Sequence, residues 1–267
     1  MTLDFTLKKY EDLCKFFVSE KIHTLRMGEY LESKSCNRRN LIMRHDVDRY
    51  PASALEIAKI ENRWNIVSSF YFRMKKSVFI PSLIKDILSL GHEIGYHYEV
   101  VDKAEGDLEK AIEIFAGELE EFRKICDVKT IAMHGNPLSK WDNKVIWSKY
   151  DFKDYGIIGE PYLSIDYSKV VYLSDTGRSW VTGRHKVKDY APGFHEQLRV
   201  ASTDELMDFL RKCDQDVCLL AHPNRWSANW HDYIYQWTYD TMGNIVKSCL
   251  RPVRRADLKQ TETHITH

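Results

Sequence analysis

The stretch Leu41-Ile-Met-Arg-His-Asp-Val-Asp48 decides the fold, because an apolar run changes there into a dense cluster of charged residues. A short apolar run with polar flanks predicts a buried strand at Leu41–Met43. Downstream of it, helical patterns alternate with further short apolar runs along most of the chain. This alternation is typical of βα units arranged around a mainly parallel sheet, so the sequence predicts an α/β fold.

The other predicted strands are short and rich in apolar residues: Ile66–Phe72, Glu93–His97, Thr130–Met133, Val170–Leu173 and Val217–Ala221. The predicted helices show apolar spacings of three and four or an N-terminal capping pattern: Ala52–Asn62, Pro81–Leu90, Asp107–Lys124 and the segment that begins at Ser202-Thr-Asp-Glu205.

Polar clusters directly follow five of these strands. They are RHDVD at 44–48, HYE at 97–99, HGNP at 134–137, SDTGR at 174–178 and HPNRW at 222–226. In parallel α/β folds, ligands bind at the carboxyl ends of the strands. One such cluster is as readily a solvated loop with a capping residue, but five in equivalent positions indicate a functional site.

Asp46 and Asp48 are two residues apart, so on an extended strand both side chains point to the same side. Close carboxylates repel, and a divalent metal is the usual relief. One aspartate could then bind metal while the other accepts a proton, although an Asx turn is the simpler alternative. His97 could complete a mixed His and Asp shell for zinc or another first-row metal. The alternative for His97, and equally for His134 and His222, is a buried hydrogen-bonded core histidine.

Aromatic residues concentrate after the last polar cluster, from Trp226 to Trp237. Flat aromatic faces with polar tips suit sugar rings, and Trp226 is the favoured candidate for a ligand contact. Tyr233 and Trp237 are spaced as one face of a helix and could simply pack against the protein.

Composition limits the function classes. The 267 residues include 39 basic and 39 acidic side chains, so no global field attracts nucleic acid. No apolar run approaches the roughly 20 residues that span a bilayer, and the N-terminus lacks the pattern of a signal peptide, so we expect a cytoplasmic protein. Six scattered cysteines without a C-x-x-C pair argue against a cysteine zinc site.

We expect one domain at 38–250, a helical lead-in at 1–37 and a surface tail at 251–267.

Three stretches resemble motifs of the polysaccharide deacetylase superfamily, also called the NodB-homology or carbohydrate esterase 4 family. Met43-Arg-His-Asp-Val-Asp48 is similar to its first aspartate motif, Gly91-His-Glu-Ile-Gly-Tyr-His97 to its second, and Leu219-Leu-Ala-His222 to its last. Order and spacing agree from about residue 38 to residue 225. The combination of RHDVD, GYHYE, MHGNP, SDTGR and HPNRW resembles a divergent cytoplasmic branch found with genes for lipopolysaccharide or surface-glycan synthesis.

The resemblance implies a distorted (β/α)7 barrel and a metal-dependent hydrolase that removes an N-acyl group, such as acetyl, from an amino sugar or glycan precursor. By position, Asp46 would be the catalytic base and His222 the general acid, while Asp48 and His97 would bind one divalent metal, zinc first among the choices. The family's second metal histidine falls on Val101, which cannot ligate. We therefore expect the third ligand to be His134, with Glu99 as the alternative.

The remaining expectations concern the substrate. Asp175 and Arg178 would orient sugar hydroxyls or a phosphate, with Asn224, Arg225 and Trp226 as further contacts. Two other functions stay open at this point. One is hydrolysis of a different non-peptide C–N bond by the same residues, and the other is a catalytically silent glycan-binding protein, which the valine at 101 favours.

Overall fold

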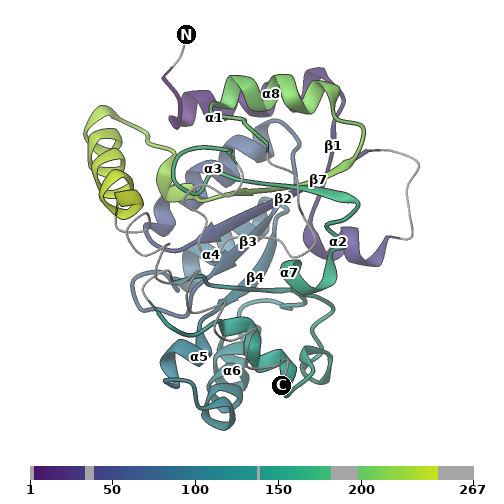
Figure 1. Cartoon of the computed structure of the whole chain (residues 1–267), viewed down its shortest axis with the longest axis vertical. Helices are drawn as coiled ribbons and strands as arrows, with labels where there is room; N and C mark the ends of the chain where they lie inside the picture. The colour runs from purple at the N-terminus through teal and green to yellow at the C-terminus, as the bar shows by residue number, and fades with distance from the viewer. Residues whose placement is uncertain (1–2, 34–38, 137–138, 182–197, 246–267) are drawn as a thin grey trace, which may run out of the picture.

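Seven parallel strands form one curled sheet, shown with its surrounding helices in Figure 1. The computed structural model describes residues 3–33, 39–136, 139–181 and 198–245. The strand order is β5-β4-β3-β2-β7-β6, and β1 pairs with β2 beside this path. The strands are β1 His23–Leu25, β2 Asn40–Val47, β3 Ser69–Phe72, β4 Glu93–Tyr98, β5 Ile131–Met133, β6 Val170–Ser174 and β7 Asp216–Ala221. Since β5 and β6 end the order without pairing to each other in the described residues, the structure is an open, distorted (β/α) barrel.

The central strand β2 organises the sheet. One edge pairs with β7 from Leu41 to His45, and the other edge pairs with β1 at its start and with β3 from Arg44 onward. Successive side chains of a strand point to opposite faces. Arg44 and Asp46 therefore share one face, while His45 points to the other, where it meets Glu61 of helix α3.

The longer helices are α1 Leu7–Ser19, α3 Pro51–Arg63, α4 Pro81–Ser89, α6 Leu108–Arg123 and α8 Thr203–Lys212. Shorter helical pieces are α2 Met27–Glu32, α5 Val100–Lys103, η1 Asn143–Ser148, η2 Phe152–Tyr155, α7 Pro161–Ser164 and η3 Pro223–Arg225, and residues 230–245 are also helical. Helix α6 shows why they form: Asp107 caps its first turn by accepting from the Lys110 amide, and its apolar stripe, including Phe115 and Leu119, is buried.

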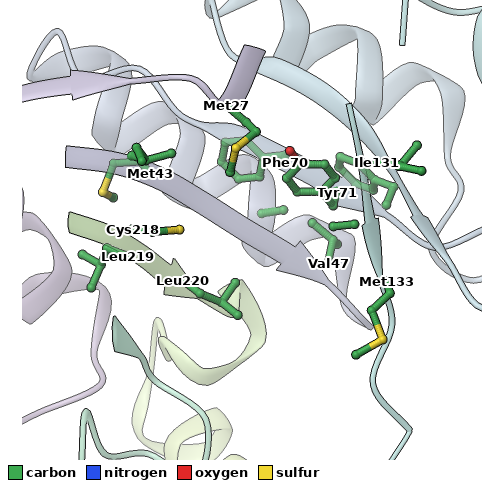
Figure 2. Packing of buried hydrophobic residues seen from close by; sticks show 14 of the residues in the cluster. Met27, Met43, Val47, Phe70, Tyr71, Ile131, Met133, Cys218, Leu219 and Leu220 are labelled. Atoms are coloured by element: carbon green, nitrogen blue, oxygen red, sulfur yellow. The ribbon is translucent and has the colours of Figure 1, made fainter. Parts of the chain in front are cut away.

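The core fills the space between strands and helices with aliphatic, aromatic and sulfur-containing side chains. Figure 2 shows Met43 of β2 near Leu219 of its partner strand β7, and Phe70 and Tyr71 of β3 among the same buried side chains. The ring of Tyr71 also covers Gly95 of β4, where a Cβ atom would lie only 2.3 Å from a ring carbon. Close packing of this kind leaves room for glycine alone.

The six predicted strands and four predicted helices are all present. The short strand β1 was not predicted, because three residues give too little periodicity to recognise. The apolar run at 41–43 predicted a strand that ends at Met43, but β2 continues through charged residues to Val47. The extension is possible because these buried polar groups find partners in the fold. The predicted tail at 251–267 lies outside the described residues. In the part of the chain that is described, no helix is long and apolar enough to span a bilayer.

Candidate active site

The polar residues that follow β2, β4, β5 and β7 meet around the carboxylate of Asp48. The Nε2 atom of His97 lies 3.3 Å from Asp48 Oδ1, and that of His134 lies 3.6 Å from the same oxygen. The Nε2 atom of His222 lies 4.0 Å from Asp48 Oδ2. Asp46 joins the group, since its Oδ2 is 3.5 Å from His97 Nε2. The expected convergence at the carboxyl edge of the sheet is therefore present in the structure.

His97 turns its Nε2 toward these carboxylates. Its Nδ1 lies 2.9 Å from the carbonyl oxygen of Ala132, which can only accept, so Nδ1 carries a proton. When the ring is neutral, its unprotonated Nε2 faces Asp48 Oδ1, a buried atom without a hydrogen-bond partner in the described structure. Two electron-rich atoms at this distance repel each other unless a proton or a cation lies between them.

Electrostatics at the cluster follow from burial and opposite charges. Burial alone would raise the pKa of Asp48, but His134, His97 and His222 outweigh it and hold that pKa well below its usual value. Burial dominates at His134 and lowers its pKa, which favours the neutral imidazole. At His97, burial is outweighed by Asp46 and Asp48, and the pKa is raised.

Glu99 lies on the other side of the His134 ring. One carboxylate oxygen of Glu99 is 3.4 Å from His134 Nδ1, whereas Nε2 of the ring faces Asp48. Glu99 also accepts from Nε of Arg73 at 3.3 Å and forms an ion pair with its Nη2. Burial is outweighed by His134 and Arg73, so the pKa of Glu99 is lowered. The Glu99 carboxylate thus supports His134 from behind rather than facing Asp48. Val101, in the short helix α5, is fully buried.

Asp46 forms a bidentate ion pair with Arg44, its neighbour two positions earlier on the same strand. The guanidinium Nε and Nη2 donate to the two carboxylate oxygens at 2.8 and 2.7 Å. The Arg44 side chain is completely buried and its guanidinium carbon lies 4.8 Å from the centre of the Tyr162 ring. This ion pair fixes both oxygens of Asp46 beside His97.

His222 is held by Asp175, which follows β6. Asp175 Oδ1 is 2.6 Å from His222 Nδ1 and accepts from Arg225 Nη1 at 2.9 Å. Its Oδ2 accepts from the His222 backbone at 2.9 Å and from Trp226 Nε1 at 3.1 Å. Burial would raise the pKa of Asp175, but His222 and Arg225 outweigh it and lower that pKa. Because Asp175 engages Nδ1, the nitrogen that faces Asp48 is Nε2.

Asp175, Arg225 and Trp226, which the sequence predicts as substrate contacts, all contact protein groups in the structure. Asp175 and Trp226 are 0% and 1% exposed, and the Trp226 ring packs 4.9 Å from that of Tyr10. Both are therefore committed to protein partners, and so is Arg225 through Asp175. Position at a strand end does not by itself distinguish a residue that faces a ligand from one that supports its neighbour.

Arg178 and Asn224 are the other two residues that the sequence predicts as substrate contacts. Arg178 has a left-handed backbone with φ of 55°, and its guanidinium lies 4.9 Å and 4.7 Å from the ring centres of Phe5 and Tyr233. Its Nη1 donates to the carbonyl of Arg225, whereas its Nη2 is buried and has no hydrogen-bond partner in the described structure. Asn224 is 5% exposed, and its Oδ1 has no partner in the described structure, which leaves one acceptor beside His222.

Two site residues were missed from the sequence. Arg44 has the same two-residue spacing that singled out Asp46 and Asp48, and this spacing was the available signal. Arg73 comes immediately after β3, the strand end to which no cluster was assigned, and its Nη1 reaches the Asp48 carbonyl oxygen at 3.4 Å.

No three His, Cys, Asp or Glu side chains in the described ranges already form a metal-binding arrangement. The donor chemistry of Asp48, His97 and His134 nevertheless fits a divalent metal. Asp48 supplies a buried oxygen without a hydrogen-bond partner, and His97 supplies an imidazole nitrogen that faces it. His134 points its Nε2 at the same oxygen. One carboxylate and two histidines are ligands that zinc accepts.

Comparisons with known proteins found similarity only at the level of solved structures. No protein-family model and no curated protein matches the chain. Two solved structures are similar: a CE4 family pseudoenzyme from Bacillus anthracis, with 15% identity and a TM-score of 0.38, and a mutant of that pseudoenzyme with restored enzymatic activity, with 13% identity and a TM-score of 0.39. The matches cover 77% and 80% of this chain but only 62% and 65% of the pseudoenzyme and of its mutant, respectively.

Proposed function

We propose that this protein is a metal-dependent amide hydrolase that removes an N-acyl group from an amino sugar. The observation that supports the proposal most is the meeting of Asp46, Asp48, His97, His134 and His222 at one edge of the sheet. This set contains ligands for a metal, a fixed carboxylate base and a histidine whose remote nitrogen is held by a buried aspartate.

Asp48, His97 and His134 would hold one divalent metal, with zinc as our first choice. When bound, such an ion polarises an acyl carbonyl and lowers the pKa of water. The Ala132 carbonyl fixes Nδ1 of His97, while Glu99 lies beside Nδ1 of His134. Partners of this type orient metal-binding histidines and fix their tautomers.

Asp46 would take the proton from the attacking water. The bidentate contact with Arg44 holds its carboxylate in one orientation, with Oδ2 turned toward His97. A general base must lie within reach of the proton that it removes, and Asp46 occupies the position next to the metal ligands.

His222 would protonate the departing amine. Expulsion of an unprotonated amine anion is prohibitive, so the reaction needs an acid on this side. Asp175 holds Nδ1 and directs Nε2 toward Asp48, and the lowered pKa of Asp175 keeps this carboxylate charged beside the ring. Asp175 is thus a positioning residue for the acid.

The amino-sugar substrate rests on the resemblance of RHDVD, GHEIGYH and LLAH to the deacetylase motifs. We place the substrate among precursors of lipopolysaccharide or other surface glycans, because the combination of five motifs resembles that branch. Acetyl is the acyl group we expect.

Metal content of the purified protein tests the proposal first. Elemental mass spectrometry should find about one equivalent of zinc or a related ion in the wild type, and a loss in His97→Ala and His134→Ala. Glu99→Gln should weaken binding about 10- to 100-fold without abolishing it, as expected for a supporting residue. His231→Ala, a change of an exposed histidine on the helix at 230–245, is the matched control and should keep the metal.

Activity is then measured as acetate release from N-acetylated amino sugars by metal-loaded protein. Release that depends on Asp46 and His222 supports the deacetylase. Turnover of other amides or ureides alone would redirect the proposal to a different C–N bond, and sugar binding without metal or turnover would contradict it.

A further inference from the structure

The helix at 230–245 has its polar side turned inward and its apolar side turned outward. It is the yellow helix at the left of Figure 1. Of the fourteen large hydrophobic side chains that are exposed in the described residues, seven lie on this helix: Trp230, Ile234, Tyr235, Trp237, Tyr239, Met242 and Ile245. Trp230 is 65% exposed and Trp237 is 52% exposed. A surface helix of a soluble domain normally shows the opposite arrangement.

The inward side makes polar contacts with the rest of the protein. Gln236 Oε1 accepts from Arg49 Nη2 at 3.0 Å, and Asp240 lies 3.7 Å from Arg225 Nε. Asn244 donates to the Gly177 carbonyl oxygen at 3.2 Å. Tyr235 and Tyr239 also contact Tyr50 and Arg49, respectively, whereas in the described part of the chain no side-chain contact of this kind involves Trp230, Ile234, Trp237 or Ile245.

Four of the outward side chains lie on one face of the helix. Trp230, Ile234, Trp237 and Ile245 follow spacings of four, three and eight residues, which place them on one face of a helix. Contiguous exposed apolar surface of this kind marks an interaction site.

We infer that this helix lies on the surface of an anionic lipid bilayer, with the stripe of Trp230, Ile234, Trp237 and Ile245 in the interfacial layer. The inference is independent of the proposed hydrolase function. Tryptophan and tyrosine favour the interface because an apolar ring and a polar tip suit the headgroup level. An amphipathic helix that lies in the interface plane buries such a face.

Charge supports a lipid surface over a second copy of this chain. The helix carries only two acidic residues, Asp232 and Asp240, and Asp240 faces inward to Arg225. The sequence that follows, 246–259, contains five basic residues and one acidic residue: Lys247, Arg251, Arg254, Arg255 and Lys259 against Asp257. The whole chain has no net charge, so this basic stretch next to the aromatic helix is a local feature. Basic residues beside an amphipathic helix are attracted to anionic headgroups.

Vesicle flotation with the full chain tests the inference. Vesicles of phosphatidylcholine with about 30 mol % phosphatidylglycerol should bind the wild type, and pure phosphatidylcholine vesicles should bind it at least tenfold more weakly. Binding should fall as salt is raised from about 0.1 M to 0.5 M. The double variant Trp230→Ser, Trp237→Ser should lose at least tenfold in affinity, because two interfacial anchors are removed.

The matched control is Val18→Ser with Leu163→Ser, which removes two exposed apolar side chains from α1 and α7. It should bind like the wild type, and circular dichroism should show that both double variants are folded. Absence of binding to anionic vesicles, or equal affinity of the tryptophan variant and the wild type, would overturn the inference. The inference would also be overturned if the protein did not bind vesicles and instead formed a concentration-dependent dimer that only the tryptophan variant abolished.

Discussion

At the scale of single residues, the candidate site depends on how completely each carboxylate is engaged. Both oxygens of Asp175 have two partners each, and both oxygens of Asp46 are held by Arg44. Asp48 differs, since its Oδ1 has no hydrogen-bond partner although three histidines surround the carboxylate. This contrast separates the carboxylates that support other groups from the one that is available for a cation.

Asp175→Asn should slow hydrolysis roughly 100- to 10,000-fold. The amide has one acceptor oxygen where the carboxylate has two, and it no longer fixes the tautomer of His222. Metal content should stay at the wild-type value, since Asp175 is not among the ligands. The pH profile of kcat should change as well, which a purely structural defect would not cause. Asp166→Asn, the same substitution at a carboxylate in the loop before β6, is the control and should leave kcat unchanged. A fully active Asp175→Asn enzyme would refute the assignment of His222 as the acid.

At the scale of helices and strands, local patterns in the sequence predicted the elements well. The presence of the strands and the convergence of Asp46, Asp48, His97, His134 and His222 followed from alternation and from the known geometry of parallel sheets, although the end of β2 did not. The partners of Asp175 could not be predicted, because its contact with His222 joins residues 47 positions apart. Spacing along the chain holds no information on such a pair.

The close contact between β3 and β4 makes a prediction about packing. Gly95→Ala should destabilise the protein by about 1–3 kcal/mol, because the added methyl group would lie 2.3 Å from the Tyr71 ring and 2.9 Å from the Thr130 carbonyl oxygen. Gly117→Ala is the matched change in the open interior of α6 and should stabilise by about 0.5–1 kcal/mol. Urea denaturation of both variants measures the two values. Equal effects at the two positions would show that the β3–β4 contact is looser than described.

A buried network between β2 and α3 makes a prediction about pH. Glu61 accepts from Ser68 at 2.6 Å and lies 2.8 Å from His45 Nε2, and neither Glu61 nor His45 is exposed. Burial would raise the pKa of Glu61, but His45 outweighs it, so the folded-state pKa lies below the ordinary 4.5. A depressed pKa adds stability above about pH 4.5, and this stability is lost as the pH falls through the folded value.

Glu61→Gln should therefore lower the free energy of unfolding by about 1–3 kcal/mol at pH 7, because Ser68 and His45 lose an ionised acceptor in a buried network. The difference from the wild type should shrink as the pH falls below about 4.5. Glu56→Gln changes an exposed residue of the same helix and should have almost no effect. A pH-independent difference would mean that the charge of Glu61 contributes nothing to stability.

At the scale of the whole molecule, ligands for one proposed metal come from three different strands. Asp48 follows β2, His97 lies in β4 and His134 follows β5, so a bound ion would connect the centre of the sheet to its edge. Any ligand that binds only the folded state stabilises it by mass action.

Zinc at about 100 times its Kd should stabilise the protein by about 2.7 kcal/mol. For a chain of this size, this corresponds to a rise in Tm of roughly 5–10 °C. Removal of the ion with a chelator should reverse the rise in the wild type. His97→Ala should show neither change, and an equal response of this variant in thermal unfolding would place the bound metal elsewhere.

The ion pair of Arg44 with Asp46 has a consequence for the order of folding. Its partners are two positions apart on one strand, so no long loop has to close before the carboxylate of Asp46 is compensated. The contact of Asp175 with His222 spans 47 residues and needs β6 and β7 to be paired. Contacts of large sequence separation carry the greater entropic cost and form slowly. We therefore expect the contact of Arg44 with Asp46 to form earlier in folding than the contact of Asp175 with His222.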